Sequence, residues 1–366
     1  MFEELIDVDP DAKGVLEKSL EGRRINEEEA LVLMDDAAIF SISLVANELR
    51  KRKVGDVVTY VVNRNINFTN ICIGGCKFCA FRRGKGDPDS YLLSIEEICE
   101  RTIIAEEAGA TEVCIQGGLH PDLGPEFYSR ILEEIKRVSD VHIHAFSPME
   151  IHYVAERSGL GIEETLKMLK ESGLDSVPGT AAEILDDSIR YQICPHKIKT
   201  EEWRRIITTA HKLGIPTTAT MLYGHVEMPQ DQIRHLKILR DIQDSTSGFT
   251  EFVPLSFVHY NTPLYLSGGS KGGATGYEDL KVYAISRIFL DNFTNIQASW
   301  VKLGRKLSQL MLSFGANDLG GTLMEENISR SAGRVVEMLD KDELERMILE
   351  SNRIPKQRDT LYRLVS

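Results

Sequence analysis

The sequence lacks the long apolar runs and the basic stretches that would point to a membrane or to nucleic acid. Nowhere in its 366 residues do 18 uninterrupted apolar residues occur, so no segment is expected to span a bilayer. The N-terminal run MFEELIDVDPDAKG is acidic and has no apolar signal-peptide core. The net charge is -13, and no basic stripe with interleaved aromatics occurs. We therefore expect a cytoplasmic protein that binds neither membranes nor nucleic acid.

Cysteine is also scarce. Six cysteines in a chain of this length do not form a disulfide framework. The hydrophobic fraction of 42% is ordinary for a protein that buries a sizeable core. The length allows either two average domains or one large barrel.

Three of the six cysteines lie together, in the run NFTNICIGGCKFCAFRR. Cys72, Cys76 and Cys79 have the spacing C-x3-C-x2-C, and no fourth cysteine lies close by. Three thiolates on one tight loop can hold three corners of a cubane 4Fe-4S cluster, which leaves one iron with an open coordination position. An open iron can bind a substrate, whereas four cysteines would suit a closed electron-transfer cluster.

A zinc site is the alternative interpretation of closely spaced cysteines. Structural zinc takes four ligands, usually from two separated pairs, and the chain has no second C-x2-C or H-x3-H pair. The other cysteines, Cys99, Cys114 and Cys194, fall in a helix pattern, a strand pattern and a loop, and we interpret them as buried or incidental thiols. The ligand number and the flanking residues favour the iron-sulfur interpretation.

Strand-like and helix-like patterns alternate along the chain from about residue 57. The expected strands are Val57–Asn67, Glu112–Gln116, Val141–Ala145, Asp175–Pro178, Thr217–Tyr223, Thr250–Phe257, Asn295–Val301 and Asn317–Leu323. Helical patterns lie between them, with apolar residues at helix spacing. This alternation predicts an α/β fold, a (β/α)8 TIM-type barrel over residues 57–366 with a C-terminal helix, rather than an open doubly wound sheet. Residues 1–56 are predicted to form an N-terminal helical segment.

Polar residues cluster where the expected strands end, which is where such a barrel has its active site. The candidates are Asn63, Arg64, Asn65, Asn67, His142, His144, Glu183, His225, Glu227, His259, Gln297, Ser299, Asp318, Glu325, Glu326 and Asn327. Some of them are expected to line a cavity, because a closed apolar core would leave them unsatisfied. Asp318, Glu325 and His259 are the catalytic candidates.

Two glycine-rich stretches need interpretation. Gly117-Gly118 ends the second strand; it is either a turn that needs positive φ or a place where backbone approaches a ligand. Its position relative to the cysteine loop favours the ligand. The run SGGSKGGATG, residues 267–276, formally matches a G-x-S-x-G nucleophile elbow, but that elbow needs a strand running into a helix around the serine. We interpret the run as a flexible polar loop and a candidate lid over the barrel mouth.

The cysteine loop, with Phe78 just before its last cysteine, resembles that of the radical S-adenosylmethionine (radical SAM) superfamily. RNINFTNIC, HAFSPMEI, TTATMLYGHVE, FVPLSFVH, NIQASWVKLG and PKQRDTLYR resemble one branch, which includes aminofutalosine synthase, dehypoxanthine futalosine cyclase and the tyrosine-using subunit of FO synthase. PGTAAEILDD with ICP, and GANDLGGTLMEENISRSAG, are most similar to that subunit, whereas the cyclase typically has PGGGAEIL and FGSTMMEEN. HYNTP departs from the subunit, which more often has a methionine and an acidic residue after the histidine.

The resemblance implies two cofactors, a 4Fe-4S cluster on Cys72, Cys76 and Cys79, and S-adenosylmethionine, whose amino and carboxylate groups chelate the open iron. The residues that it implies for S-adenosylmethionine are Phe78, Gly117, Gly118 and Glu183. Phe78 would lie near the adenine, and the glycine pair would approach the methionyl amino group.

The implied reaction joins the 4-hydroxybenzyl group of L-tyrosine to 5-amino-6-(D-ribitylamino)uracil, on the way to the deazaflavin FO and coenzyme F-420. A 5'-deoxyadenosyl radical would take hydrogen from tyrosine, the Cα–Cβ bond would break, and the 4-hydroxybenzyl fragment would add to the uracil. A low-potential electron donor is implied, and also a separate radical SAM subunit that closes the deazaflavin ring, because this chain has one cysteine loop of this kind.

Two other functions remain open. One is a menaquinone-pathway enzyme on the same fold, acting on a futalosine-type nucleoside. The other is a non-enzymatic iron-sulfur carrier, which would predict four cluster ligands or a small domain.

Overall fold

The structure is a computed structural model, and it describes residues 8–35, 38–335 and 338–365. The strands are β1 (Val57–Val61), β2 (Asn63–Asn67), β3 (Glu112–Gln116), β4 (His142–Ala145), β5 (Thr217–Tyr223), β6 (Phe249–Ser256), β7 (Asp318–Gly321) and β8 (Ile354–Gln357). The helices are α1 (Pro10–Leu20), α2 (Glu27–Asp35), α3 (Ile39–Val54), α4 (Ile95–Glu107), α5 (Pro125–Val138), α6 (Pro148–Ser158), α7 (Ile162–Glu171), α8 (Asp187–Ile193), α9 (Thr200–Lys212), α10 (Pro229–Thr246), α11 (Pro263–Leu266), α12 (Gly276–Phe289), α13 (Trp300–Leu303), α14 (Arg305–Met311), α15 (Ile328–Ser331) and α16 (Lys341–Glu350).

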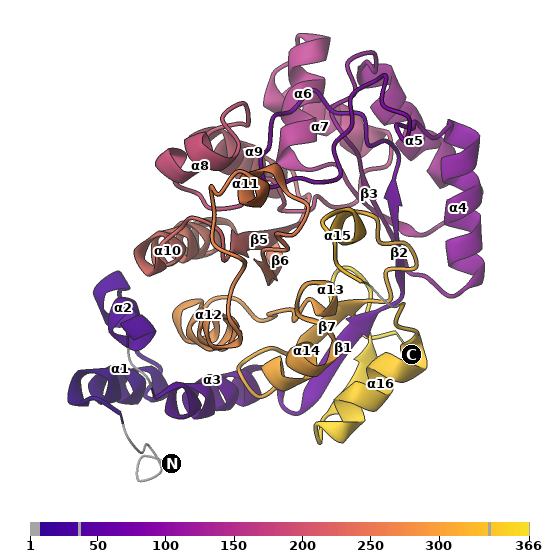
Figure 1. The fold of residues 1–366 in the computed structure, drawn as a ribbon. Helices are drawn as coiled ribbons and strands as arrows, with labels where there is room; N and C mark the ends of the chain where they lie inside the picture. The colour runs from indigo at the N-terminus through magenta and orange to yellow at the C-terminus, as the bar shows by residue number, and fades with distance from the viewer. Residues whose placement is uncertain (1–7, 36–37, 336–337, 366) are drawn as a thin grey trace.

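The named strands pair in parallel, in three small sheets of order β7-β1-β8, β2-β3-β4 and β5-β6. Single parallel bridges link the sheets: His144 with Ser176, Val177 with Thr217, Phe252 with Ile296, and Gln297 with Asp318. Regular pairing does not close into a barrel within the described ranges. The structure shows a parallel α/β fold in which helices surround the strands (Figure 1).

The expected strand at 57–67 is divided at Val62. Its first half pairs with β7 and β8, and its second half pairs with β3. Strand β8 was not predicted, because the run IPKQ contains a proline and has no apolar alternation.

Two other expected strands are reduced to bridges. The run at 175–178 contributes Ser176 and Val177, and the run at 295–301 contributes Ile296 and Gln297. The second run turns early into helix α13, where Trp300 donates its indole N–H to the Gly321 carbonyl at 2.9 Å. Both predictions had the strand position right and its length wrong.

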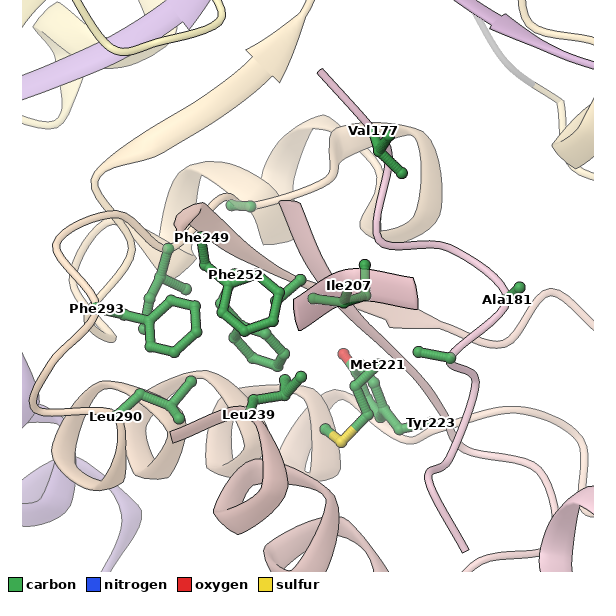
Figure 2. Close-up of a cluster of buried hydrophobic side chains, with 14 of the residues drawn as sticks. Val177, Ala181, Ile207, Met221, Tyr223, Leu239, Phe249, Phe252, Leu290 and Phe293 are labelled. Carbon is green, nitrogen blue, oxygen red and sulfur yellow. The ribbon is translucent and has the colours of Figure 1, made fainter. Parts of the chain in front are cut away.

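Alternation along β5 separates a face packed on helices from a face toward the interior. Met221 and Tyr223 are fully buried and lie near Leu239 of α10 (Figure 2). Thr220 and Leu222, one residue along, line the cavity described in the next section. Strand residues of one face thus hold the helices while those of the other face shape the interior.

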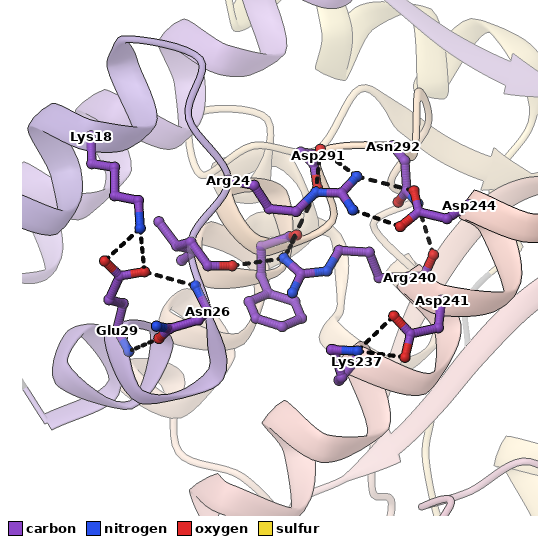
Figure 3. Close-up of polar contacts among 12 residues, drawn as sticks. Lys18, Arg24, Asn26, Glu29, Lys237, Arg240, Asp241, Asp244, Asp291 and Asn292 are labelled. Carbon is purple, nitrogen blue, oxygen red and sulfur yellow. Dashed lines mark hydrogen bonds and ion pairs between the residues drawn. The ribbon is translucent and has the colours of Figure 1, made fainter.

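Helices α1, α2 and α3 precede β1 and share one hydrophobic core with the rest of the chain. Arg24, which follows α1, donates to Asp244 and Asp291 at 2.6 to 3.0 Å (Figure 3). These side chains are about 40% exposed, so the ion pairs contribute little and apolar packing holds the helices in place.

None of the helices in the described ranges is both long enough and apolar enough to cross a membrane.

A buried charge cluster closes the amino ends of the strands, and the C-terminal segment provides its cation. Arg358 donates to both oxygens of Asp318, at 2.8 and 3.2 Å, and lies 3.5 Å from Glu251. Tyr362 donates its hydroxyl to Glu251 at 2.5 Å. Burial raises the pKa of Glu251 to about 7, and the Arg358 charge opposes that rise. The cluster therefore depends on Arg358.

Replacing Arg358 with Met is expected to lower the free energy of unfolding by about 3–5 kcal/mol, because two buried carboxyl groups lose their cation. Urea unfolding followed by circular dichroism measures the loss. The control is Arg205→Met, which removes an arginine whose side chain is 58% exposed and should cost less than about 1 kcal/mol. Equal losses in the two variants would contradict this account.

Candidate functional site

A cavity of about 420 Å³ lies at the carboxyl ends of the strands. Its lining comes from the loops after β2, β3, β4 and β7 and from the ends of β5 and β6. Its volume falls in the range of small-molecule sites. In parallel α/β folds the carboxyl ends of the strands are where ligands bind.

The cysteine loop forms one wall of this cavity, and Cys72, Cys76 and Cys79 all line it. Two arginines form hydrogen bonds with the backbone of Cys72, the first cysteine of the loop. The Cys72 N–H donates to the Arg83 carbonyl at 3.1 Å, and Arg82 Nε donates to the Cys72 carbonyl at 2.9 Å. The protein's own hydrogen bonds thus fix the start of the loop beside the cavity.

The thiols fit a cubane cluster better than a single ion. Burial raises the pKa of the Cys76 thiol to about 12 and also raises that of Cys79, so their thiolate forms need a compensating metal charge. A cubane spreads its ligated irons over separate corners, whereas structural zinc needs four converging ligands.

Close packing is the reason for both glycines of the Gly117-Gly118 pair. A Cβ on Gly117 would lie 2.5 Å from the Phe68 ring, and one on Gly118 would lie 2.3 Å from the Ile71 carbonyl oxygen. Neither glycine has a positive φ, so the interpretation as a positive-φ turn is wrong. The Gly117 N–H donates to Glu150 at 2.9 Å, and the Gly118 N–H is bonded to a backbone carbonyl.

Glu150 lines the cavity and was not among the predicted site residues. It accepts hydrogen bonds from Ser147 as well as Gly117, and burial raises its pKa to about 7. The sequence signal was the run Ser-Pro-Met-Glu, which predicts a capping box at the start of a helix. That pattern locates Glu150 on α6, but it does not show that the carboxyl group reaches the neighbouring strand end.

Glu183 lies in the cavity wall beside Phe78 and Lys197. Lys197 Nζ is 2.5 Å from Glu183 Oε1 and 5.2 Å from the centre of the Phe78 ring. Burial opposes the charge on Lys197, but the Glu183 carboxylate outweighs it and raises the pKa of Lys197 above its ordinary value. Glu183 Oε2 is buried without a hydrogen-bond partner, and its backbone has a φ of 43°. Strain and an unmet acceptor at one residue are typical of ligand sites.

The catalytic candidate Asp318 does not line the cavity. It is the first residue of β7 and is fully buried at the amino ends of the strands, where Arg358 and Thr59 donate to it. Its place fits a structural role and does not fit contact with substrate. The predicted strand 317–323 already had Asp318 near its amino end, so the catalytic assignment did not follow from the position of the strand.

Glu325 and His259 also lie outside the cavity lining. Arg101 donates to Glu325 at 2.7 Å and Arg64 donates to it at 3.3 Å, so this carboxylate is bound on the outer side of its loop. The His259 ring packs on Tyr260 and Tyr265, with centroids 4.1 and 4.4 Å away.

The loop 267–276 lies beside His259 and does not line the cavity. Lys271 N–H donates to the His225 carbonyl at 3.2 Å, and Gly273 approaches the His259 ring. Its role as a lid stays a prediction.

Several other predicted polar residues do line the cavity. They are Asn67, Glu183, Ser299 and Glu326. Lys197 and Lys302 also line it, although the sequence singled out neither, because a lysine in a helical or loop pattern is ordinarily solvated. Lys302 Nζ donates to Ser329 Oγ at 2.8 Å. Glu326 lines the cavity, whereas its neighbour Glu325 is bonded to Arg101 and Arg64 outside the lining.

Models of two families match the chain in succession. The radical SAM superfamily matches residues 66–239, and the CofH/MqnC C-terminal region matches residues 246–366. Two solved structures share the fold. Methylornithine synthase is 19% identical with a TM-score of 0.71, over 93% of this chain and 97% of that one. The [FeFe]-hydrogenase maturase HydG from Carboxydothermus hydrogenoformans is 17% identical with a TM-score of 0.74, over 96% and 81%. The fold is thus the TIM-like α/β fold of radical SAM proteins.

Curated relatives cover nearly the whole chain. A protein of Methanocaldococcus jannaschii is 56% identical over 94% of this chain and 98% of its own. A protein of Methanococcus vannielii is 53% identical over 95% and 99%. Both are named 5-amino-6-(D-ribitylamino)uracil--L-tyrosine 4-hydroxyphenyl transferase. The chain therefore belongs to the radical SAM superfamily and, within it, to the family of these transferases.

Proposed function

We propose that this protein transfers the 4-hydroxybenzyl group of L-tyrosine to 5-amino-6-(D-ribitylamino)uracil. The names of the relatives give this substrate pair, and their identity extends over nearly the full chain. The structural observation that carries the proposal is one cavity lined by three cysteines, a glycine pair and several polar side chains. The menaquinone-pathway alternative has no such support.

Cys72, Cys76 and Cys79 are the residues that would hold the 4Fe-4S cluster of this family. When bound, the cluster and S-adenosylmethionine supply a hydrogen-abstracting radical. We assign the glycine pair 117–118, which lines the cavity, to the methionyl amino group; an ammonium group only donates, so backbone carbonyls of this pair would accept from it. Glu183 Oε2, a buried acceptor without a partner, suits a hydroxyl donor such as a ribose.

The rest of the cavity suits a radical reaction on a polar substrate. Leu222, Leu255 and Val301 contribute apolar walls, which exclude water and competing hydrogen donors. Asn67 and Ser299 lie among them. Asn67 Oδ1 is buried and has no partner in the described chain, so it is available to a substrate N–H or hydroxyl.

The wider assignments follow from the same family. The eight strand positions, some joined by single bridges, are proposed to form a (β/α)8 arrangement over residues 57–366, preceded by the helical segment 1–56. A low-potential electron donor and a separate radical SAM subunit are the proposed partners. A cytoplasmic location would keep the cluster thiols reduced.

Replacing Cys72, Cys76 or Cys79 with Ala is expected to abolish reductive cleavage of S-adenosylmethionine, because each replacement removes one cluster ligand. Formation of 5'-deoxyadenosine by reconstituted protein with dithionite, under anaerobic conditions, measures it. Cys99→Ala is the matched control: this half-buried thiol lies on α4 and not in the cavity lining, so cleavage should persist. Full activity of Cys76→Ala would sink the cluster assignment.

Formation of 5'-deoxyadenosine should rise sharply when tyrosine and the diaminouracil are supplied together, and should not respond to dehypoxanthine futalosine. Buried polar groups that match one substrate are left unpaired by another, so discrimination of about 10⁴ is expected. Turnover of the futalosine at a comparable rate would overturn the substrate assignment and leave the cluster assignment intact.

The protein alone should stop at the coupled adduct of tyrosine and the diaminouracil. Ring closure needs a second radical step, and the chain has one C-x3-C-x2-C loop. Mass spectrometry identifies the adduct, and fluorescence reports FO. Fluorescent FO made without a second protein would show that the partner subunit is not needed.

A further inference from the structure

Two opposite charges in the cavity have no role in the cofactor assignments above. Lys302 of α13 and Glu326, on the loop after β7, both line the cavity. Ser329 connects them. Lys302 Nζ donates to Ser329 Oγ at 2.8 Å, and the Ser329 N–H donates to Glu326 Oε1 at 2.7 Å. One residue thus bonds a cation through its hydroxyl and an anion through its backbone N–H, on the same wall of the cavity.

Lys302 has no bonded carboxylate within residues 8–35, 38–335 and 338–365; its bond to Ser329 is to a neutral hydroxyl. Burial lowers the pKa of its ammonium and the charge of Arg334 acts in the same direction, while the charges of Glu326 and of the cluster-loop thiol Cys79 oppose them. Lys197, the other half-buried lysine of the cavity, is paired with Glu183 at 2.5 Å. A half-buried cation without a bonded anion is unfavourable, and an incoming carboxylate would compensate its charge.

Glu326 is similarly placed to receive a cation. Its Oε2 accepts from Asn65 Nδ2 at a distance of 3.4 Å, which is long for such a bond. Glu326 lies on the loop after β7, and Lys302 lies after the strand position at Gln297. Gly117 lies after β3, and Glu183 lies after the strand position at Val177. They therefore belong to different loops of the cavity wall from the residues assigned to S-adenosylmethionine.

We propose that Lys302 and Glu326 form a subsite for the head group of a zwitterionic α-amino acid, with the carboxylate on Lys302 and the ammonium on Glu326. Ser329 is the positioning residue that holds both. This subsite rests on the proposed function, in which the amino acid is tyrosine. The subsite would select a substrate that carries both its carboxylate and its ammonium group.

The first test uses the unaltered, reconstituted protein with S-adenosylmethionine bound. Tyrosine is compared with tyramine, which lacks the carboxylate, and with 3-(4-hydroxyphenyl)propionate, which lacks the ammonium. Calorimetry under anaerobic conditions measures each dissociation constant. Tyrosine should bind about 10- to 100-fold more tightly than either analogue, the effect of losing one hydrogen bond to a charged group. Equal affinity for all three ligands would overturn the subsite.

The second test assigns each group to its residue. Lys302→Met should weaken tyrosine to the level of tyramine and leave tyramine unchanged, while Lys302→Arg should retain most of the preference. Glu326→Gln should remove the preference over the propionate and keep that over tyramine. The control is Lys281→Met, whose lysine donates to the Met34 carbonyl and lies outside the cavity lining; its ligand preferences should match the unaltered protein. Every variant should still show the electron paramagnetic resonance signal of one 4Fe-4S cluster, which confirms that the cluster is loaded.

The outcomes separate this subsite from the proposed function. If the unaltered protein couples tyrosine to the diaminouracil but Lys302→Met weakens tyrosine and tyramine equally, the subsite is wrong and the function stands. If the unaltered protein does not couple tyrosine, yet Lys302→Met selectively weakens another α-amino acid relative to its decarboxylated amine, the subsite stands and the substrate assignment is wrong.

Discussion

The two-part pairing of residues 57–67 determines where the two ends of the molecule lie. The first half of this stretch is hydrogen-bonded between β7 and β8, and the second half pairs with β3. The cysteine loop begins a few residues after β2 ends, so the same stretch that receives the C-terminal strand β8 also delivers the loop to the cavity. A change in the register of β1 would move both, because a slip of one residue turns every side chain to the opposite face.

Buried polar groups are paired at the amino ends of the strands and partly unpaired at the carboxyl ends. At the amino ends, Arg358 meets Asp318 and Glu251, and Tyr362 adds a further bond. At the carboxyl ends, Asn67 Oδ1 and Glu183 Oε2 are buried without partners. An unsatisfied buried polar atom costs about 1–3 kcal/mol of folding free energy. The paired charge cluster at the amino ends helps to offset this cost of the cavity. Stability and ligand binding are thus divided between the two ends of one set of strands.

The sequence predicted those parts of the site that local spacing determines. Cys72, Cys76 and Cys79 share one loop, and the glycine pair 117–118 ends a strand, so their places followed from pattern alone; all of them line the cavity. The choice between Glu325 and Glu326 did not follow, because two adjacent residues on an irregular loop have no periodicity to assign them to a face.

Long-range contacts explain the remaining differences. Asp318 was expected at the cavity although it stands near the start of the predicted strand 317–323; the structure places it at the amino end of β7, where Arg358 donates to it. Lys302 became a site residue only through the fold, which buries its ammonium beside Ser329 and Glu326. β8 is polar and contains a proline, so only its pairing with β1 marks it as a strand.

The balance of charge in the cavity explains why its two lysines have different roles. Lys197 and Glu183 are bonded to each other, so that pair is neutral before any ligand arrives and presents Glu183 Oε2 as a hydrogen-bond acceptor. Lys302 and Glu326 are each bonded to Ser329, and neither is bonded to the other. A zwitterion compensates both charges without adding net charge to a buried space, whereas a simple amine or a simple acid brings one uncompensated charge with it. Selection for an intact amino acid then follows from electrostatics, and the aromatic ring is left to contact the apolar walls.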